Sequence, residues 1–304
     1  MVMMTSKALG LKTVMTEHTL FPFGSLETLH LNKLCKWYLK DVDAAIGVSH
    51  ACKDNFVLRA KIDPNICFTI PNAVDTSKFH PNPSLRYPLN KIIIVFVARL
   101  TARKGVDFLI DIIPEVLNKC PNAHFIIGGD GDKTPLLKEL VKKYGYENSV
   151  ELVGALRNDD VPKVLQRGHI FLNTSLTESF CLSMLEAASC GLLVVSTDVG
   201  GIPEVLPEGV AYLARPDAAS LSKQLFRAMK DFDKISCSKM HNIVKDTYSW
   251  RMVAQRTEFV YDFAMNQPDL DVYQRLKNSA SWGQAVGLAA VLFTILEFLI
   301  IAFL

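Results

Sequence analysis

Short apolar runs alternate with amphipathic segments along the second half of the chain. The runs predict strands at residues 92–97, 124–127, 150–153, 170–173, 193–197 and 210–214, and the segments between and after them predict helices at residues 106–119, 134–144, 160–166, 181–190, 218–231 and 250–265. Continuous apolar strands are expected where both faces of a parallel sheet are covered. This alternation predicts a doubly wound α/β domain at residues 89–265.

The first part of the chain follows the same rhythm with fewer elements. Strands are predicted at residues 12–16, 44–48 and 66–70, and helices at residues 1–8, 29–38 and 50–60. Pro81, Pro83 and Pro88 indicate a linker. We therefore predict an α/β fold with two Rossmann-like domains, of which the N-terminal one, residues 1–88, is incomplete. A domain of this kind would leave a sheet edge exposed and its core poorly covered.

Residues 285–304 differ from the rest, because Glu297 is their single charged residue and they contain no proline. Twenty such residues can cross the core of a bilayer. Arg275 and Lys277 lie in the juxtamembrane segment 266–284, so the positive-inside rule places the preceding domains in the cytoplasm. Glu297 would be costly in lipid unless a partner helix pairs with it. The alternative is a buried core helix.

Composition narrows the class of protein. With 304 residues, 49% hydrophobic and 21% charged, the chain can bury a large core. A net charge of only +2 argues against a nucleic-acid partner. The seven cysteines are odd in number and contain no C-x-x-C pair, which indicates reduced thiols in a cytosol-like compartment rather than disulfides or a zinc site.

The most informative polar segment follows the predicted strand 170–173. Glu178 lies in a turn, a helix is predicted to begin near Phe180-Cys181-Leu182, and Glu186 lies inside that helix, with seven residues between the two glutamates. The free N–H groups of a helix start favour an anion, and carboxylates on either side can accept hydroxyl groups. This combination suits a sugar nucleotide. The alternative is a solvated carboxylate pair beside an ordinary turn.

Other predicted strand ends carry compatible groups. Arg99 and Lys104 follow strand 92–97 and suit a phosphate group, although an exposed basic turn has the same composition. Gly129 and Gly131 follow strand 124–127 and would let backbone approach a ligand, as they would in any tight turn. His18 follows strand 12–16 and could orient the donor or the acceptor, or be a half-buried structural histidine.

Several motifs carry a resemblance to a known class of enzymes. They are Ala98-Arg99-Leu100, Arg103-Lys104-Gly105, Gly128-Gly129-Asp130-Gly131, residues 178–186 and Gly200-Gly201-Ile202-Pro203-Glu204. Together they resemble the retaining GT-B glycosyltransferases, which include the sucrose and glycogen synthases. Residues 16–18, 70–75, 168–178 and 186–191 resemble more closely the family of catalytic subunits of phosphatidylinositol N-acetylglucosaminyltransferase.

This resemblance implies a function and a location. The chain would transfer N-acetylglucosamine from UDP-GlcNAc to phosphatidylinositol with retention, the first step of GPI-anchor biosynthesis. It would do so as a single-pass protein of the endoplasmic reticulum membrane, with cytoplasmic domains and with other membrane subunits of the transferase complex as partners. No metal and no other cofactor is implied, since cations and a helix dipole would neutralise the leaving diphosphate.

The resemblance also assigns roles to residues. Arg99 and Lys104 would bind the donor diphosphate, with backbone groups near Gly129, Gly131, Phe180, Cys181 and Leu182 completing the donor site. Glu186 would hold the ribose hydroxyls, Glu178 the transferred sugar, and His18 would lie near the reacting sugar. The family's opening strand and Gly-Gly loop are not found here. Two alternatives therefore stay open: an inactive membrane-tethered subunit, and a related retaining transferase that uses another nucleotide sugar.

Overall fold

The computed structural model describes the chain except for Met1, Pro22, Phe23, Ser25, Lys40, Glu208, Ile235, residues 281–283 and Leu304. The chain forms two compact units. The first unit comprises Met1–Pro71 and Val253–Leu304, and the second unit comprises Asn72–Met252. Helix α10 (Trp250–Met265) starts in the second unit and continues into the first.

The second unit is built on six parallel strands in the order β6-β5-β4-β7-β8-β9. Its elements are β4 (Ile92–Val97), η2 (Ala102–Lys104), α4 (Val106–Lys119), β5 (Ala123–Gly128), α5 (Thr134–Tyr144), β6 (Val150–Gly154), α6 (Val161–Leu165), β7 (Ile170–Asn173), α7 (Leu182–Ser189), β8 (Leu193–Thr197), η3 (Ile202–Glu204), β9 (Ala211–Ala214), α8 (Ala218–Asp231) and α9 (Cys237–Thr247). The predicted doubly wound sheet is confirmed. Strand order reverses between β4 and β7, the point at which such sheets bind ligands.

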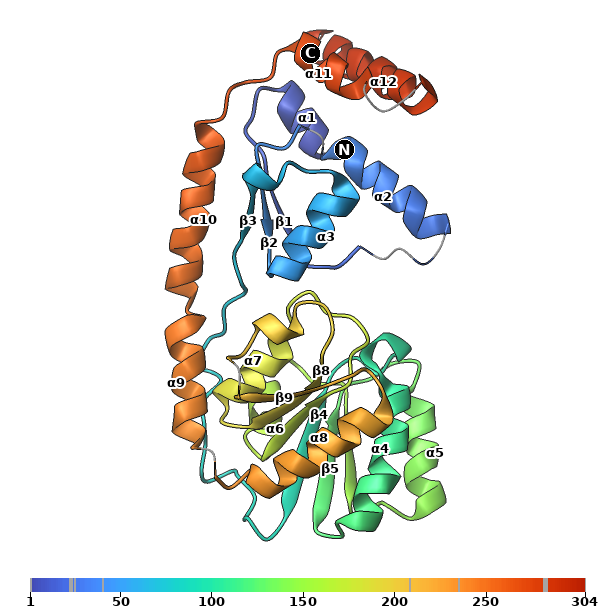
Figure 1. Ribbon diagram of the computed structural model, residues 1–304, viewed down its shortest axis with the longest axis vertical. Helices are drawn as coiled ribbons and strands as arrows, with labels where there is room; N and C mark the ends of the chain where they lie inside the picture. Colours follow the sequence, from blue (N-terminus) through green and yellow to red (C-terminus); the bar gives the residue numbers. More distant parts are fainter. Residues whose placement is uncertain are drawn as a thin grey trace. The chain divides into compact units, whose positions relative to one another are not determined.

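Helices cover both faces of this sheet, as Figure 1 shows. Helices α4 and α8 contact each other and pack on one face, whereas α6 and α7 contact the strands from the other. Ile94 and Phe96 of β4 are buried in one cluster with Leu109 of α4 and Leu225 of α8. Strands buried on both faces explain why the apolar runs are continuous in the sequence.

His169 anchors the linker segment to the amino edge of the sheet. Its Nδ1 accepts a hydrogen bond from Ile93 N at 3.0 Å, so the other ring nitrogen carries the proton and donates to Tyr87 O at 3.0 Å. Burial, with the nearby charge of Arg86, lowers the pKa of His169 to about 4. The ring is therefore a neutral structural group at neutral pH.

The first unit contains a three-stranded parallel sheet in the order β1-β2-β3. Its elements are α1 (Val2–Ala8), β1 (Val14–Glu17), α2 (Leu26–Tyr38), β2 (Ala44–Gly47), α3 (His50–Ala60), η1 (Pro64–Ile66), β3 (Cys67–Thr69), the second part of α10, α11 (Val272–Ala280) and α12 (Gln284–Phe303). Ala45 packs with Phe56 of α3 on one face, and Ile46 packs with Val260 of α10 on the other. The expectation of a poorly covered core was wrong, because α10 returns to cover the second face.

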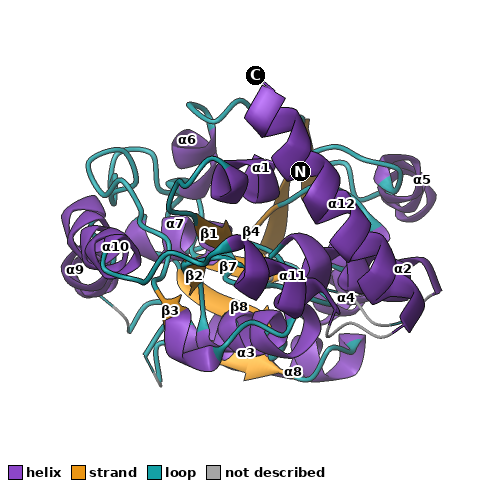
Figure 2. Ribbon diagram, turned by 90° about the horizontal axis from the view of Figure 1, so that it is seen from above, coloured by secondary structure: helices purple, strands orange, loops and turns teal. Residues whose placement is uncertain are grey.

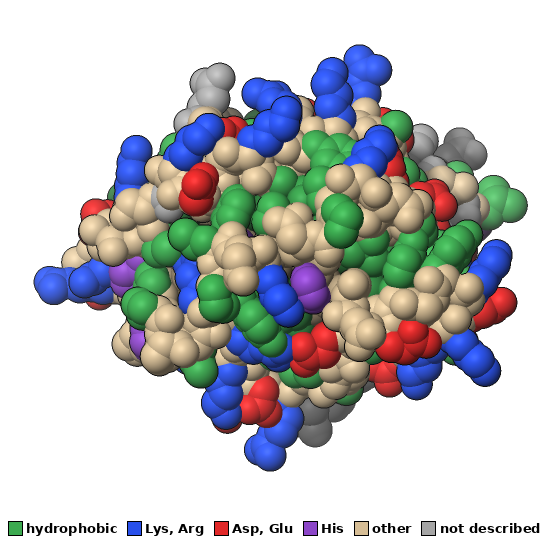
Figure 3. Space-filling model, turned by 90° about the horizontal axis from the view of Figure 1, so that it is seen from below, with side chains coloured by type: hydrophobic (Ala, Val, Ile, Leu, Met, Phe, Trp, Pro, Cys, Tyr) green, Lys and Arg blue, Asp and Glu red, His purple; other side chains and the backbone are tan. Residues whose placement is uncertain are grey.

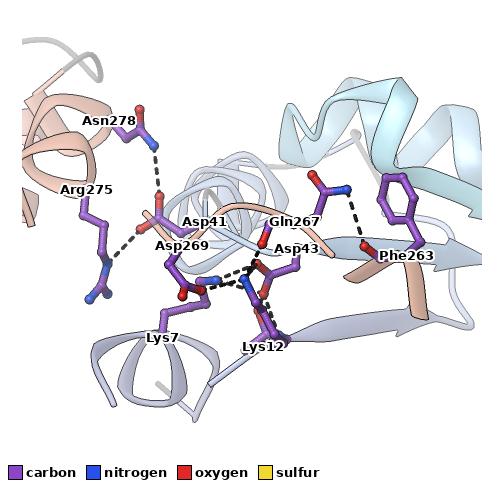
Figure 4. A network of polar contacts seen from close by, with 10 residues as sticks. Lys7, Lys12, Asp41, Asp43, Phe263, Gln267, Asp269, Arg275 and Asn278 are labelled. Carbon is purple, nitrogen blue, oxygen red and sulfur yellow. Dashed lines mark hydrogen bonds and ion pairs between the residues drawn. The ribbon is translucent and has the colours of Figure 1, made fainter. Parts of the chain in front are cut away.

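A polar network joins the C-terminal segment to this sheet (Figure 4). Asp43 accepts from Lys7 Nζ at 2.7 Å and from Thr13 N at 2.6 Å, and both charged side chains are almost fully buried. Lys12 Nζ donates at 2.6 Å to both Gln267 O and Asp269 Oδ1. Ion pairs therefore connect β1 and β2 with the segment that follows α10.

Helix α12 packs against α11 (Figure 2). Gly287 allows this close approach, since a Cβ there would lie 2.8 Å from Ala280 O. Within the described parts of the chain, none of the helices combines the length and apolarity needed to cross a membrane. Leu304, the last residue of the expected span, and the side chain of Glu297 lie outside the described residues.

The surface carries charges of both signs, and most of the cysteines are buried. On the face seen in Figure 3, blue Lys and Arg side chains are interspersed with red Asp and Glu side chains and with green apolar side chains. All seven cysteines are free thiols, and five of them are buried. The prediction that the cysteines are partly buried is confirmed.

Candidate active site

The loops that follow β4, β5 and β7 meet at the carboxyl edge of the second unit's sheet, because β4 lies between the other two strands. Leu176 N donates to Arg103 O at 3.0 Å and joins the loops after β7 and β4. Leu100 N donates to Asp130 O at 2.9 Å and joins the loops after β4 and β5. The predicted site residues of this unit therefore share one edge.

Lys104 and Glu178 form an ion pair at the centre of this edge. The Lys104 ammonium contacts Glu178 Oε1, and the two side chains are 24% and 13% exposed. Ser175 Oγ lies 2.8 Å from the same carboxylate oxygen. A lysine ammonium has three N–H donors, so this pairing leaves capacity for a phosphate group. Lys104, predicted to bind phosphate, and Glu178, predicted to bind the sugar, are thus in direct contact.

Gly105 holds the lysine loop against the loop after β7. Its φ is +66°, and a Cβ at this position would overlap the carbonyl oxygen of Thr174. The Thr174 hydroxyl lies 2.7 Å from Lys104 O and 2.9 Å from Gly105 O. This position needs glycine both for its backbone conformation and for close approach. The position of Lys104 relative to Glu178 is therefore set by backbone packing.

Gly129 and Gly131 make a second close approach. Gly129 has a φ of +130°, and a Cβ there would overlap Ala98 O; a Cβ on Gly131 would overlap Leu100 O. Both glycines thus pack against the loop that carries Arg99. The sequence suggested that their missing side chains admit a ligand. What the structure describes is their approach to the protein's own backbone.

The start of α7 lies directly after Glu178. Phe180 is buried and packs edge-to-face on Tyr248 with ring centroids 5.8 Å apart. Cys181 has a φ of +41° and a buried thiol, whose pKa is raised to about 12 by burial and then by the charge of Glu178. A protonated thiol is a poor nucleophile, so the Cys181 side chain is not a candidate for nucleophilic chemistry. Leu182, 40% exposed, opens the helix.

Glu186 lies in α7 in a different environment from Glu178. Its side chain is half-buried, and within the described part of the chain its carboxyl group has no hydrogen-bond partner. Burial raises its pKa to about 7, against the opposing charge of Lys78. A half-buried carboxyl group with unused acceptor capacity is suited to bind hydroxyl groups.

Two further predicted site residues have exposed side chains. Arg99 follows β4 and has an exposed side chain. His18 belongs to the first unit, where it is exposed immediately after β1. The preceding Glu17 is buried, and its Oε1 accepts from Thr19 N at 2.7 Å. The turn that carries His18 is therefore fixed by its own hydrogen bonds.

Sequence reasoning overlooked the buried polar residues that precede Glu178. Asn173-Thr174-Ser175 has the form of a glycosylation sequon, and no role in the site was predicted for these residues from the sequence. All three side chains are buried, and each is hydrogen-bonded. A run of polar residues directly after a buried strand is the signal that could have revealed them, since buried polar groups need partners.

Two cavities of the second unit are lined by none of the predicted site residues. A cavity of about 540 Å³ lies between α4 and α5, lined by Pro114, Leu136 and Tyr144 among others. Another, of about 350 Å³, lies at the amino ends of β4 and β5. Across the described residues, no group of three or more His, Cys, Asp and Glu side chains could hold a metal ion. Charged and hydroxyl-binding groups converge instead at the carboxyl edge.

Family comparisons agree with this arrangement. Residues 91–231 match the profile of the family described as "Glycosyl transferases group 1", and residues 1–78 match "Glycosyltransferase Family 4". The crystal structure of Anabaena HepE in complex with UDP-glucose superposes with a TM-score of 0.73 at 21% identity, over 85% of this chain and 76% of that one. The chain belongs to the glycosyltransferases of the GT-B fold.

Within that class, the chain is similar to proteins named as subunits of phosphatidylinositol N-acetylglucosaminyltransferase. It is 44% identical to the relative from Arabidopsis thaliana and 46% identical to the relative from Homo sapiens, in each case over 98% of this chain. The aligned regions cover 66% and 62% of those relatives. The chain therefore spans just under two thirds of the length of the curated relatives it matches.

Proposed function

We propose that the chain transfers N-acetylglucosamine from UDP-GlcNAc to phosphatidylinositol with retention, the first step of GPI-anchor biosynthesis. The similarity to the named subunits of the plant and human transferases supports this donor and acceptor. The main structural support for a nucleotide-sugar site is the placement of Lys104, Glu178 and Glu186 around the start of α7.

The site residues have distinct roles in this proposal. Glu186 accepts the ribose hydroxyls, and Lys104 with Arg99 binds the diphosphate beside the free N–H groups of the α7 start. Glu178 accepts a hydroxyl of the transferred sugar. As the bond to the sugar breaks, negative charge develops on the diphosphate, and the fixed cations and helix dipole stabilise it. For His18 we keep the role that the resemblance implies, a position near the reacting sugar.

The test is turnover by membranes that carry the full chain and lack another source of the activity. Labelled UDP-GlcNAc should give a GlcNAc-phosphatidylinositol product, and Glu178→Gln should lower the rate by at least about 100-fold. Glu139→Gln, on the exposed face of α5, is the matched control and should leave the rate unchanged.

Other results would redirect the proposal. Product from UDP-glucose but not from UDP-GlcNAc would favour a transferase with another donor. Absence of product with intact UDP binding would favour an inactive subunit of the complex.

We also propose that residues 285–304 form a single-pass span in the endoplasmic reticulum membrane, with the preceding domains cytoplasmic. Support comes from the sequence, whose single charged residue in this stretch is Glu297. The relatives are named as subunits, which supports partner subunits in the membrane. After alkaline carbonate extraction the chain should stay with the membranes, and Glu297→Leu should reduce recovery of its partners. Release of the chain, or unchanged recovery, would contradict the span or its pairing.

A further inference from the structure

The two oxygens of the Glu178 carboxylate have different surroundings. Oε1 is contacted by Lys104 Nζ and lies 2.8 Å from Ser175 Oγ. Among the described residues, Oε2 makes no hydrogen bond of its own. One oxygen is therefore occupied by the protein, and the other is available to a ligand.

Ser175 is fully buried and has a single hydroxyl proton for two acceptors. Its Oγ lies 2.8 Å from Glu178 Oε1 and 2.8 Å from Asn173 Oδ1. Ser196 fixes the orientation of the amide: its hydroxyl donates to Thr197 O, so it accepts from Asn173 Nδ2 at 2.9 Å. The amide oxygen of Asn173 is thereby turned toward Ser175, where it competes for the proton.

The Ser175 hydroxyl donates its proton to the Glu178 carboxylate rather than to Asn173 Oδ1, because a carboxylate accepts a hydrogen bond more strongly than an amide oxygen. The backbone around the pair is fixed as well. Thr197 Oγ1 donates to Ser175 O at 2.6 Å, and Gly201 N donates to Glu178 O at 3.0 Å. The hydroxyl of Ser175 thus meets the carboxylate from a fixed direction, whereas the flexible ammonium of Lys104 can follow it.

We propose that Ser175 is a positioning residue that holds Glu178 Oε1, so that Oε2 faces the transferred sugar. Without this hydroxyl, Lys104 is the remaining partner of Oε1, and the carboxylate rotates with the lysine side chain. The assignment rests on the proposed function, because it takes Glu178 to bind the sugar of the donor. It predicts that loss of the Ser175 hydroxyl weakens binding or transfer of the sugar and leaves binding of the UDP part unchanged.

The experiment compares UDP with UDP-GlcNAc by titration calorimetry on the full chain, together with transfer rates. Ser175→Ala should weaken UDP-GlcNAc binding or lower kcat by roughly 10- to 100-fold, the effect of losing a hydrogen bond to a charged group. UDP affinity should stay within about twofold. Ser222→Ala removes another buried hydroxyl, on α8, and is the matched control that should alter neither.

Ser175→Cys keeps the side chain's shape with a weaker donor, and it decides the outcome if the alanine variant does not fold. It should give an intermediate effect on the sugar. Unchanged sugar binding and kcat in the variants would overturn the assignment, as would an equal loss of UDP and UDP-GlcNAc affinity. If the wild type binds both nucleotides and the sugar effect is found, but phosphatidylinositol is not glycosylated, the positioning role stands and the proposed acceptor is wrong.

Discussion

At the scale of single residues, the two glutamates of the candidate site lie in unlike surroundings. Glu178 is neutralised by Lys104, whereas Glu186 is half-buried with its acceptor capacity unused. Burial holds the pKa of Glu186 at about 7, so its charge changes near neutral pH. Hydroxyl groups that donate to it favour the ionised form. Nucleotide binding should therefore be coupled to the loss of a proton.

The affinity for UDP should fall as the pH is lowered from 8 to 6, by up to about tenfold per pH unit below the pKa. Glu186→Gln should bind UDP about tenfold more weakly at pH 8 and lose this part of the pH dependence. The phosphate of UDP also titrates, and the variant corrects for that contribution. Titration calorimetry at several pH values measures both effects, and equal pH profiles for the two proteins would contradict the role of Glu186.

At the scale of elements, backbone approach sets the distance between loops. Gly105 adopts a positive φ, and a side chain there would overlap the loop after β7. Gly145, at the end of α5, has a similar φ of +68°, but a Cβ there would meet nothing within 4 Å. The two positions share a backbone conformation and differ in packing, which makes them a matched pair.

Gly145→Ala should cost about 1 kcal/mol in the free energy of unfolding, from its backbone conformation alone. Gly105→Ala should cost at least about 2 kcal/mol more, because the Thr174 backbone must also move. Chemical denaturation measures both values. Equal losses at the two positions would show that the approach of the loops is not tight.

At the scale of the whole molecule, ion pairs connect segments that are distant in sequence. Asp43 and Lys7 are 4% and 6% exposed, whereas Asp269, the partner of Lys12, is 81% exposed. Breaking a buried pair leaves an uncompensated charge, while an exposed pair contributes little. The first unit should therefore depend on Asp43 much more than on Asp269.

Asp43→Asn should lower the free energy of unfolding of the first unit by about 3 kcal/mol or more, and Asp269→Asn by less than about 1 kcal/mol. Hydrogen exchange under increasing denaturant, read separately for peptides of β2 and β4, assigns each loss to a unit. Loss of protection in β4 alone, or equal losses for both variants, would contradict this view of the network.

Most of the second unit could be predicted from the sequence. Continuous apolar runs such as 92–97 and 193–197 match β4 and β8, because a strand buried on both faces has a simple pattern. Helix α11 could not be predicted, since its buried Arg275 is paired with Asp41, 234 residues away in the chain. Ser175 was overlooked for a related reason, because its role depends on how the turn directs Glu178 back toward it.

Hydrogen–deuterium exchange with and without UDP-GlcNAc tests the location of the nucleotide-sugar site most directly. Binding at the carboxyl edge should slow exchange in residues 99–106 and 178–187, and leave residues 136–144 of α5 unchanged. Protection along the cavity between α4 and α5, with no change in the loops after β4 and β7, would contradict the account.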